Sequence, residues 1–250
     1  MRRYGLIGFP LGHSRSAAYF TEKFARERIE GCRYDLFELD TIEKLPGLLE
    51  RMPELCGFNV TIPYKRQILP FLDDLSEEAR RIGAVNCVRR TSGGQLVGYN
   101  TDAAGLSSSL ERFLAGTAPE RALVLGTGGA SEAVRYVLRR MGIGYDRVSR
   151  TPREENGERC YGYGELTPRI MASHRLIINA TPVGMSPRAD EAPPIPYASL
   201  TPEHLLFDLI YNPERTRFLE LGARQGARIC NGQEMFVRQA ERSWEIWNDR

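Results

Sequence analysis

The chain has 250 residues, of which 42% are hydrophobic, and its 34 basic and 32 acidic side chains leave a formal charge of +2. This length supports one large domain or two of ordinary size. The near balance of charge excludes the broad basic surface that is typical of proteins that bind nucleic acid or anionic membranes.

The apolar stretch in the N-terminal segment MRRYGLIGFPLGHS is too short for a signal peptide, and no apolar run approaches the roughly 18 residues of a membrane span. Five scattered cysteines form no CxxC pair, and three histidines form no HExxH motif. This pattern argues against a disulfide framework and against a metal site. We expect a soluble cytoplasmic protein that needs no metal.

Short apolar runs alternate with helix-length segments along the first hundred residues. Three strands and one helix are predicted there, at residues 4–9, 34–39, 57–60 and 16–29. Residues 84–90 and 95–100 flank the sequence TSGG, which predicts a β-hairpin with a glycine turn. The first part of the chain is therefore expected to form a mixed sheet, which ends where residues 100–104 lead into a helix.

The remainder alternates more regularly. Strands are predicted at residues 121–126, 175–180, 204–211 and 227–230, and helices at residues 131–141, 216–225 and 232–247. Alternation of this kind indicates βαβ units and a parallel sheet. The predicted fold class is α/β with two domains: a mixed, mostly parallel sheet, and a Rossmann-like unit that begins near residue 102.

A glycine-rich turn, GTGGAS (126–131), lies between a predicted buried strand and an amphipathic helix. Gly126 would permit the tight turn, and Gly128 would let a phosphate approach the backbone at the positive end of the helix. This placement predicts a dinucleotide site. Ser131 stands where the usual fingerprint has its third glycine, and the alternative is a tight turn that binds nothing.

A further strand is predicted within residues 144–154, directly after this helix, and its end should decide which nicotinamide cofactor binds. Asp146 has roughly the sequence distance of an NAD-binding carboxylate but should lie inside the strand, away from its ligand-facing end. Arg150 and Arg153 lie just beyond that end, and a guanidinium suits a 2′-phosphate because it donates two hydrogen bonds at once. The interpretation is NADP; the alternative is a pair of solvated loop arginines.

Polar clusters follow several predicted strands, at residues 13–16, 59–65, 83–86 and 100–102. Ligands collect beyond the carboxyl ends of strands in an α/β sheet, so these clusters could converge. Ser14 and Ser16 could bring two hydroxyls to a carboxylate. Equally, either serine could simply cap the helix that follows.

Lys65 and Asp102 are the reactive candidates. An ammonium beside a carboxylate can donate the proton that a ketone oxygen needs when hydride arrives, and in reverse the pair can take that proton. Pro63 is expected to start the helix that presents Lys65. Taken alone, Lys65 could be a surface lysine and Asp102 a helix N-cap.

The sequence resembles the shikimate dehydrogenase family over nearly its whole length. The resemblance rests on the blocks GLIGFPLGHSRS, GFNVTIPYK, GAVN, YNTDAAG, GTGGAS, SRT, NATPVGM, DLIYNPERT and NGQEMFVRQA. It implies reversible NADPH-dependent reduction of 3-dehydroshikimate to shikimate, with NADP(H) as cofactor. It also implies a discontinuous substrate domain, residues 1–102 completed by the C-terminal helix 232–250, with an NADP domain at 103–231.

Site residues carry over from matching blocks. Lys65 resembles the catalytic lysine with Asp102 beside it. The implied substrate-side residues are Ser14 and Ser16 for the carboxylate, Asn59, Thr61, Asn86, Asp102 and Gln239 for hydroxyls or neighbouring groups, and Tyr211. The implied cofactor-side residues are Gly126, Thr127, Gly128, Gly129, Ala130, Ser149, Arg150, Thr151, Leu209 and Gly232. The family also uses the block that contains Asn179 and Thr181 beside the nicotinamide.

The stretch after the serine pair departs from the family. Members commonly have proline and then His-Asn there, whereas this chain has Ala17, Ala18, Tyr19 and Phe20, and Arg15 replaces a commonly apolar residue. Two rival functions stay open: a quinate/shikimate dehydrogenase with relaxed cofactor use, and a sensor that binds a shikimate-like metabolite without turnover. The expected partner is a small molecule, with no nucleic acid or membrane, and a monomer and a homodimer are both compatible with the sequence.

Overall fold

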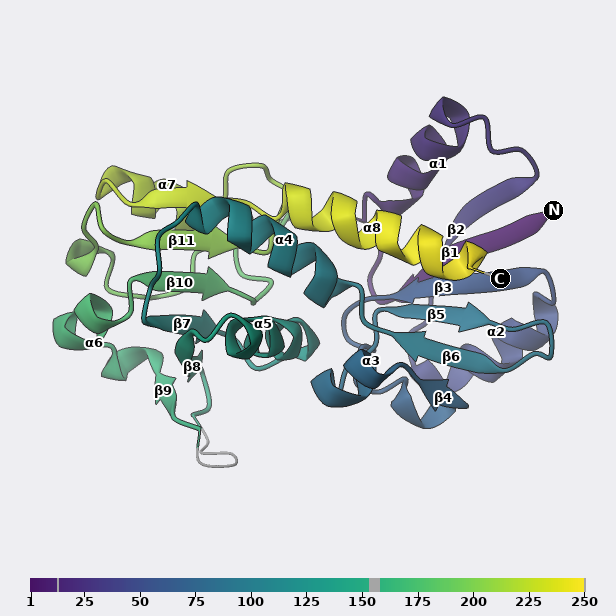
Figure 1. Cartoon of the computed structure of the whole chain (residues 1–250), viewed down its shortest axis with the longest axis horizontal. Coiled ribbons are helices and arrows are strands. Elements are labelled where there is room, and N and C mark those ends of the chain that lie inside the picture. The colour runs from purple at the N-terminus through teal and green to yellow at the C-terminus, as the bar shows by residue number, and fades with distance from the viewer. Residues whose placement is uncertain (13, 153–157, 250) are drawn as a thin grey trace. The chain divides into compact units, whose positions relative to one another are not determined.

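The computed structural model describes residues 1–12, 14–152 and 158–249. The chain forms two compact units, one of Met1–Thr101 with Ala240–Arg250 and one of Asp102–Gln239. Each unit is built around its own six-stranded sheet (Figure 1). The C-terminal helix α8 (Gln233–Asn248) contributes residues to both units.

The sheet of the first unit is mixed, as the sequence predicted. Its strands are β1 (Arg2–Gly8), β2 (Cys32–Glu38), β3 (Leu55–Val60), β4 (Asp74–Leu75), β5 (Cys87–Arg90) and β6 (Leu96–Tyr99). They lie in the order β2-β1-β3-β5-β6-β4, and β5 runs antiparallel to both of its neighbours. The predicted hairpin is therefore confirmed, and Gly94 takes the left-handed conformation in its turn (φ 85°).

Short helices of the first unit escaped prediction. Besides α1 (Ser16–Arg26), the unit contains η1 (Ile42–Lys44), α2 (Leu45–Arg51), η2 (Leu69–Phe71) and α3 (Glu77–Ile82). Helices of six or seven residues are too short to show a clear 3.6-residue period. The ends of α3 do carry a signal, because the Ser76 side chain accepts a hydrogen bond from the N–H of Ala79 and Gly83 ends the helix at φ 72°.

The helix predicted to start at Pro63 is wrong. Residues 62–68 form turns, and no α-helix is assigned to them. Tyr64 and Ile68 are both buried, and the N–H of Ile68 donates to the carbonyl of Tyr64 at 2.9 Å. The segment therefore makes an isolated helical turn around two buried side chains, and Lys65 is presented from this turn.

Helices cover both faces of the first sheet, because side chains alternate along its strands. On one face, Ile7 of β1 packs in a cluster with α2 and the turn at Tyr64 and Ile68. On the other face, Tyr4 and Leu6 pack in a cluster with α1 and the end of α8. The C-terminal helix is therefore part of the core of this unit.

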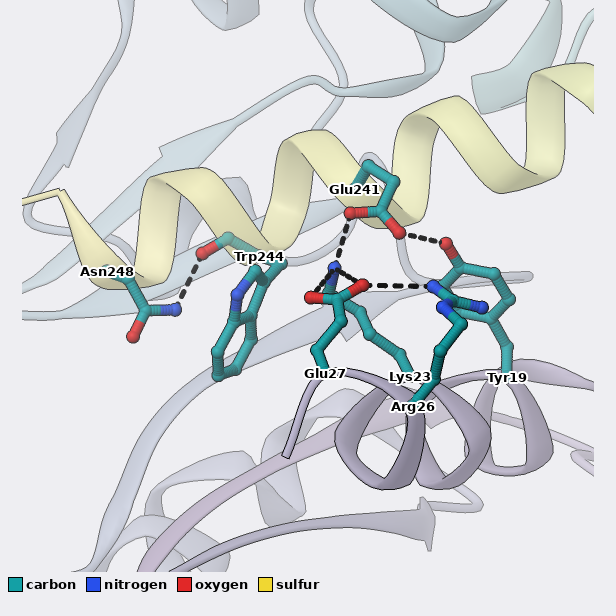
Figure 2. Close-up of polar contacts among 7 residues, drawn as sticks. All are labelled: Tyr19, Lys23, Arg26, Glu27, Glu241, Trp244 and Asn248. Atoms are coloured by element: carbon teal, nitrogen blue, oxygen red, sulfur yellow. Dashed lines mark hydrogen bonds and ion pairs between the residues drawn. The ribbon is translucent and has the colours of Figure 1, made fainter. Parts of the chain in front are cut away.

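A polar cluster joins α1 to α8 above this core (Figure 2). Lys23 is only 3% exposed, and its ammonium donates to Glu241 at 2.6 Å and to both oxygens of Glu27 at 2.9 and 2.8 Å. Tyr19 donates to the other oxygen of Glu241. Burial alone would lower the pKa of Lys23, but its hydrogen bonds to the two glutamates outweigh burial and raise it. Tyr19, part of the departure from the family pattern, thus holds the C-terminal helix.

We expect Lys23→Met to lower the free energy of unfolding by about 1–2 kcal/mol, because the methionine keeps the buried stem but loses the charge-assisted hydrogen bonds. The two glutamates can hydrate, since both are partly exposed, which limits the cost. Urea denaturation measures the difference. The control is Lys44→Met, which removes an exposed pair with Asp40 and should cost below about 0.5 kcal/mol; equal losses for both variants would contradict the assignment.

The second unit has a fully parallel sheet. Its strands are β7 (Arg121–Leu125), β8 (Gly144–Ser149), β9 (Cys160–Gly162), β10 (Leu176–Asn179), β11 (Leu205–Asp208) and β12 (Arg228–Cys230). The order is β12-β11-β10-β7-β8-β9, with all neighbouring pairs parallel. Connections therefore run outward in both directions from β7, which is the doubly wound Rossmann arrangement.

Helices and 3₁₀ turns connect these strands. They are α4 (Asp102–Leu114), α5 (Gly129–Arg140), η3 (Tyr163–Glu165), α6 (Pro168–Ser173), η4 (Tyr197–Ser199) and α7 (Arg217–Arg224). The predicted strand at 204–211 ends early, at Asp208, because the Asp208 side chain takes the N–H of Ile210 and turns the chain. The carboxyl ends of all six strands lie along one edge, which is where ligands of such sheets bind.

Candidate active site

One edge of the first sheet gathers the predicted substrate residues of that unit. β1, β3 and β6 end at this edge and β5 starts there, because β5 alone runs in the opposite direction. The segments that follow β1 and β3 are joined directly, since the N–H of Phe9 donates to the carbonyl of Ile62 at 3.1 Å. The convergence expected from the sequence is therefore present within this unit.

Ser14 and Ser16 lie at the entry to α1. The hydroxyl of Ser14 accepts a hydrogen bond from the N–H of Ser16 at 3.2 Å, and the N–H of Ser14 donates to the carbonyl of Leu11. Both serines are partly exposed. Ser14 thus has a local structural role, and its hydroxyl proton is still available for donation to a ligand. His13, which directly precedes Ser14, lies outside the described residues.

Asn59 and Asn86 belong to one buried network. The Asn59 amide donates to the Asn86 carbonyl at 3.1 Å and to the Ser243 hydroxyl at 2.8 Å, and its oxygen accepts from Tyr34 at 2.9 Å. The Asn86 side chain exchanges hydrogen bonds with Thr101, donating to its hydroxyl at 3.0 Å and accepting its backbone N–H at 2.6 Å. The network fixes the start of β5 against the end of β6.

The network has three further members, Tyr34, Thr101 and Ser243. Sequence reasoning missed Tyr34 and Ser243, and it included Thr101 only as part of the polar cluster at residues 100–102. All three are buried. Ser243 is 184 residues from Asn59 in the chain, so no local pattern could pair them. A signal existed, however, because Ser243 falls in the apolar series Phe236, Ala240, Ser243, Trp247 of α8, and a small polar residue on a buried helix face usually has a polar partner.

Thr61 and Lys65 follow β3 at the same edge. The N–H of Thr61 continues the sheet by donating to the carbonyl of Ile7 at 2.9 Å. The carbonyl of Lys65 accepts the N–H of Val85 at 2.8 Å, so the turn that carries Lys65 is tied to the residue before Asn86. Lys65 itself is half-buried. It belongs to the first unit and Asp102 to the second.

The second unit positions the glycine turn as a nucleotide site requires. Gly126 has φ 105°, and a Cβ there would lie 2.9 Å from Cγ2 of Thr181. Gly128 is the N-cap of α5 with no side-chain cap, and a Cβ there would meet nothing within 4 Å. The turn is therefore exposed at the N-terminus of α5, where the positive end of the helix dipole suits a pyrophosphate. Ser131 is fully buried, so it allows the close packing usually provided by a third glycine.

The β8 end carries the residues predicted to select NADP. Ser149 is the last residue of β8, and its hydroxyl accepts the N–H of Thr151 at 3.2 Å, while Arg150 and Thr151 are exposed. Asp146 lies within the strand, as predicted, where it binds Arg121 at 2.8 Å and His174 at 2.9 Å. It is thus removed from the ligand-facing end. Arg153, the other predicted phosphate ligand, lies outside the described residues.

Leu209, Tyr211, Gly232 and Gln239 are brought together by α8 and the segment after β11. A Cβ at residue 232 would lie 2.1 Å from the carbonyl oxygen of Leu209, so only glycine fits there. Tyr211 stacks on Phe236 of α8, with ring centroids 4.3 Å apart, and the Gln239 amide donates to the Phe236 carbonyl at 3.0 Å. The contacts between α8 and the segment after β11 therefore hold both the predicted cofactor-side residues and the predicted substrate-side residues in place.

Asp102 is the first residue of α4 and is buried. Its carboxylate lies at the positive end of that helix, a favourable place for negative charge. α4 packs closely on α8, because a Cβ at Gly105 would lie 2.7 Å from the carbonyl oxygen of Met235 and 3.2 Å from the Gln239 nitrogen. Asp102 and Gln239 therefore lie on two helices that are in direct contact.

Asp208 is a buried carboxylate that the sequence analysis did not single out. It is fully buried, and it accepts hydrogen bonds from the Asn179 amide at 3.0 Å, the Ile210 N–H at 3.0 Å and the Thr216 hydroxyl at 2.5 Å. Burial raises the pKa of Asp208 to about 7, and the three donors oppose this rise. The group therefore titrates near neutrality.

The elevated pKa of Asp208 predicts a pH dependence of stability. The Asp208 carboxyl binds its proton more tightly in the folded protein than in the unfolded chain. Its contribution to the free energy of unfolding is therefore fully present below the unfolded pKa of 3.8 and is lost as pH rises through the folded pKa of about 7. Between pH 5 and pH 8 the free energy of unfolding of the wild type should fall by roughly 2 kcal/mol relative to that of Asp208→Asn, which cannot titrate. Urea denaturation at both pH values measures this. Parallel pH profiles for the two proteins would show that Asp208 does not titrate in this range.

In the described part of the chain, His, Cys, Asp and Glu side chains form no group of three that could hold a metal ion. Among the same residues, no helix combines the length and apolar character needed to cross a membrane.

Comparison with known proteins identifies relatives over the whole chain. A family model of the shikimate dehydrogenase substrate binding domain matches residues 6–88. The chain is 38% identical, over 257 residues, to the shikimate dehydrogenase (NADP(+)) of Geobacillus kaustophilus, and the match covers 98% of this chain and 91% of that protein.

Solved structures agree with this match. Shikimate dehydrogenase 1 from Peptoclostridium difficile has a TM-score of 0.88 and 37% identity, over 100% of this chain and 92% of that one. The shikimate 5-dehydrogenase from Thermus thermophilus, solved in complex with NADP(H) and shikimate, has a TM-score of 0.85 and 34% identity, over 100% and 94% of the two chains.

Proposed function

This chain belongs to the shikimate dehydrogenase family, and from that premise we propose that it catalyses the reversible NADPH-dependent reduction of 3-dehydroshikimate to shikimate. The observation that carries the proposal is the convergence of polar segments at the carboxyl edge of the first sheet, in a chain whose second unit is a Rossmann arrangement with an open glycine turn. The reaction is an oxidoreduction at a secondary alcohol.

Lys65 and Asp102 are the acid–base pair of this reaction. NADPH, when bound, would supply a hydride for the carbonyl carbon. Lys65 would donate the proton to the carbonyl oxygen, and Asp102 would orient the ammonium. Support comes from their anchoring: Lys65 is tied through its carbonyl to Val85, and Thr101, which directly precedes Asp102, is tied to Asn86. In the oxidation of shikimate, the same pair accepts the hydroxyl proton.

The other residues have binding roles. Ser14 and Ser16 hold the substrate carboxylate, and the hydroxyl-binding group consists of Asn59, Thr61, Asn86, Tyr211 and Gln239. The glycine turn, Ser149 to Thr151, Leu209 and Gly232 hold NADP(H). The fit of the second unit to this cofactor rests on the open space at Gly128 and on the exposed Arg150 at the end of β8.

We assign residues 1–102 and the C-terminal helix 232–250 to the substrate domain, and 103–231 to the NADP domain. The two separate sheets support the division, as does the packing of the end of α8 in the core of the first unit. All five cysteines are free thiols, which favours a reducing, cytoplasmic location.

The deciding experiment follows the absorbance of NADPH with purified protein and 3-dehydroshikimate, and the formation of NADPH from NADP⁺ and shikimate. Turnover in both directions is expected, and binding without turnover would instead support a metabolite sensor. Parallel measurements of kcat/KM for quinate and for NADH test the quinate/shikimate alternative. A preference for shikimate and NADPH is expected, and comparable values for all four would favour that alternative.

Arg150→Ala should raise KM for NADPH by about tenfold to a hundredfold, the value of losing charge-assisted hydrogen bonds to a 2′-phosphate. KM for NADH, which lacks that phosphate, should change little. Steady-state kinetics with both cofactors provides the comparison. Arg169→Ala, an exposed arginine on α6 of the same unit, is the matched control, and equal changes for NADPH and NADH in Arg150→Ala would remove Arg150 from phosphate recognition.

A further inference from the structure

The strand order of the second unit divides a bound dinucleotide into two halves. In a Rossmann arrangement the turn after β7 would hold the pyrophosphate, and the end of β8 would hold the ribose that carries the 2′-phosphate. β10 and β11 lie on the opposite side of β7 (Figure 1). The ends of β10 and β11 would therefore hold the nicotinamide half.

Two chain segments leave the sheet at those ends. β10 ends at Asn179, whose side-chain oxygen accepts from the Thr181 hydroxyl at 2.6 Å and from the Thr181 N–H at 3.1 Å. Thr181 in turn contacts the glycine turn, as the 2.9 Å approach of its methyl group to a Cβ at Gly126 shows. The segment after β11 carries Leu209 and Tyr211. The segments that follow β10 and β11 would thus line the nicotinamide half of the site.

Asp208, the last residue of β11, joins the end of β10 to the segment after β11. Its Oδ1 accepts from the side-chain amide of Asn179, the last residue of β10, and from the N–H of Ile210 in the segment after β11. Its Oδ2 accepts from the hydroxyl of Thr216, the N-cap of α7. An ionised carboxylate can accept on both oxygens and donates nothing, so it suits three donors. Hydrogen bonds in a fully buried site are also stronger than in water.

We propose that Asp208 is a positioning residue for the nicotinamide half of NADP(H). Its carboxylate fixes the end of β10 and the segment after β11 relative to each other, and this fixed arrangement orients the nicotinamide. This inference rests on the proposed function for the identity of the cofactor. Asp208 touches neither ligand and acts through Asn179 and the backbone of Ile210. The adenosine half, held at β8, does not depend on it.

Calorimetric titration with two ligands separates this role from general stability. NADP⁺ spans both halves of the site, whereas adenosine 2′,5′-bisphosphate occupies only the adenosine half. At pH 8, Asp208→Asn should bind NADP⁺ about tenfold more weakly, the value of losing charged hydrogen bonds, and should bind the bisphosphate within about twofold of wild type. Unchanged NADP⁺ binding, or an equal loss for both ligands, would overturn the proposal.

A hydroxyl series provides a second test that keeps the carboxylate in place. Thr216→Val removes one donor and should weaken NADP⁺ binding about threefold or more, while Thr216→Ser, which keeps the hydroxyl, should restore it. Thr167→Val removes the equivalent N-cap of α6, away from Asp208, and should leave both affinities at wild-type values. Equal NADP⁺ affinities for the valine and serine variants at residue 216 would also overturn the proposal. Turnover by the wild type tests the proposed function separately, since these titrations need no catalysis.

Discussion

Lys65→Ala is expected to lower kcat by about a hundredfold or more, because general acid–base assistance contributes roughly 10² to 10⁴ in rate. Binding of NADP⁺ and the free energy of unfolding should stay close to wild type, since the alanine variant keeps the hydrogen bond from the N–H of Val85 to the backbone carbonyl of residue 65. Steady-state turnover, with calorimetry and urea denaturation on the same preparation, measures all three quantities.

The chain provides a matched control for this lysine. Besides Lys65 it has only Lys23 and Lys44, and Lys44 is an exposed residue paired with Asp40. Lys44→Ala should retain wild-type turnover. If Lys65→Ala turned over at a rate near wild type, the proton would have to come from another group, and the assignment of the pair with Asp102 would be lost.

Gly232→Ala is expected to have the largest effect on the cofactor side. The new methyl group would lie 2.1 Å from the Leu209 carbonyl oxygen. The nearest atoms all belong to the backbone of Leu209, so no side-chain rotation can relieve the clash. Overpacking of this kind costs about 1–3 kcal/mol of stability and sometimes more, and it displaces Leu209 and the start of α8. We expect a loss of stability in this range together with at least about tenfold weaker binding of NADP⁺.

Gly164→Ala is the control for this substitution, because a Cβ there meets nothing within 4 Å and the residue has no positive φ. It should leave both the free energy of unfolding and the affinity for NADP⁺ unchanged. Wild-type behaviour of Gly232→Ala would show that the contact between Leu209 and residue 232 relaxes easily and does not shape the cofactor site.

Local patterns were sufficient for the long elements and for the motifs between them. The parallel sheet of the second unit followed from strand and helix alternation, and the hairpin of β5 and β6 followed from TSGG. The helix predicted at Pro63 failed because proline is compatible with a helical first turn but does not require one. Burial of Tyr64 and Ile68 decided the conformation there, and burial is a tertiary property.

The sequence by itself determined where the candidate residues lie relative to the strands. The lysine, the carboxylate, the serines and the glycine turn follow strand ends, and parallel strands of a sheet end at the same edge, which makes their chemistry a prediction. What only the tertiary structure decided is the support beneath them. Ser243 binds Asn59 across 184 residues of chain, and Asp208 accepts hydrogen bonds from the end of β10, from the segment after β11 and from a helix cap. Such partners are chosen by burial, which requires each polar group removed from water to find a hydrogen bond wherever the fold provides one.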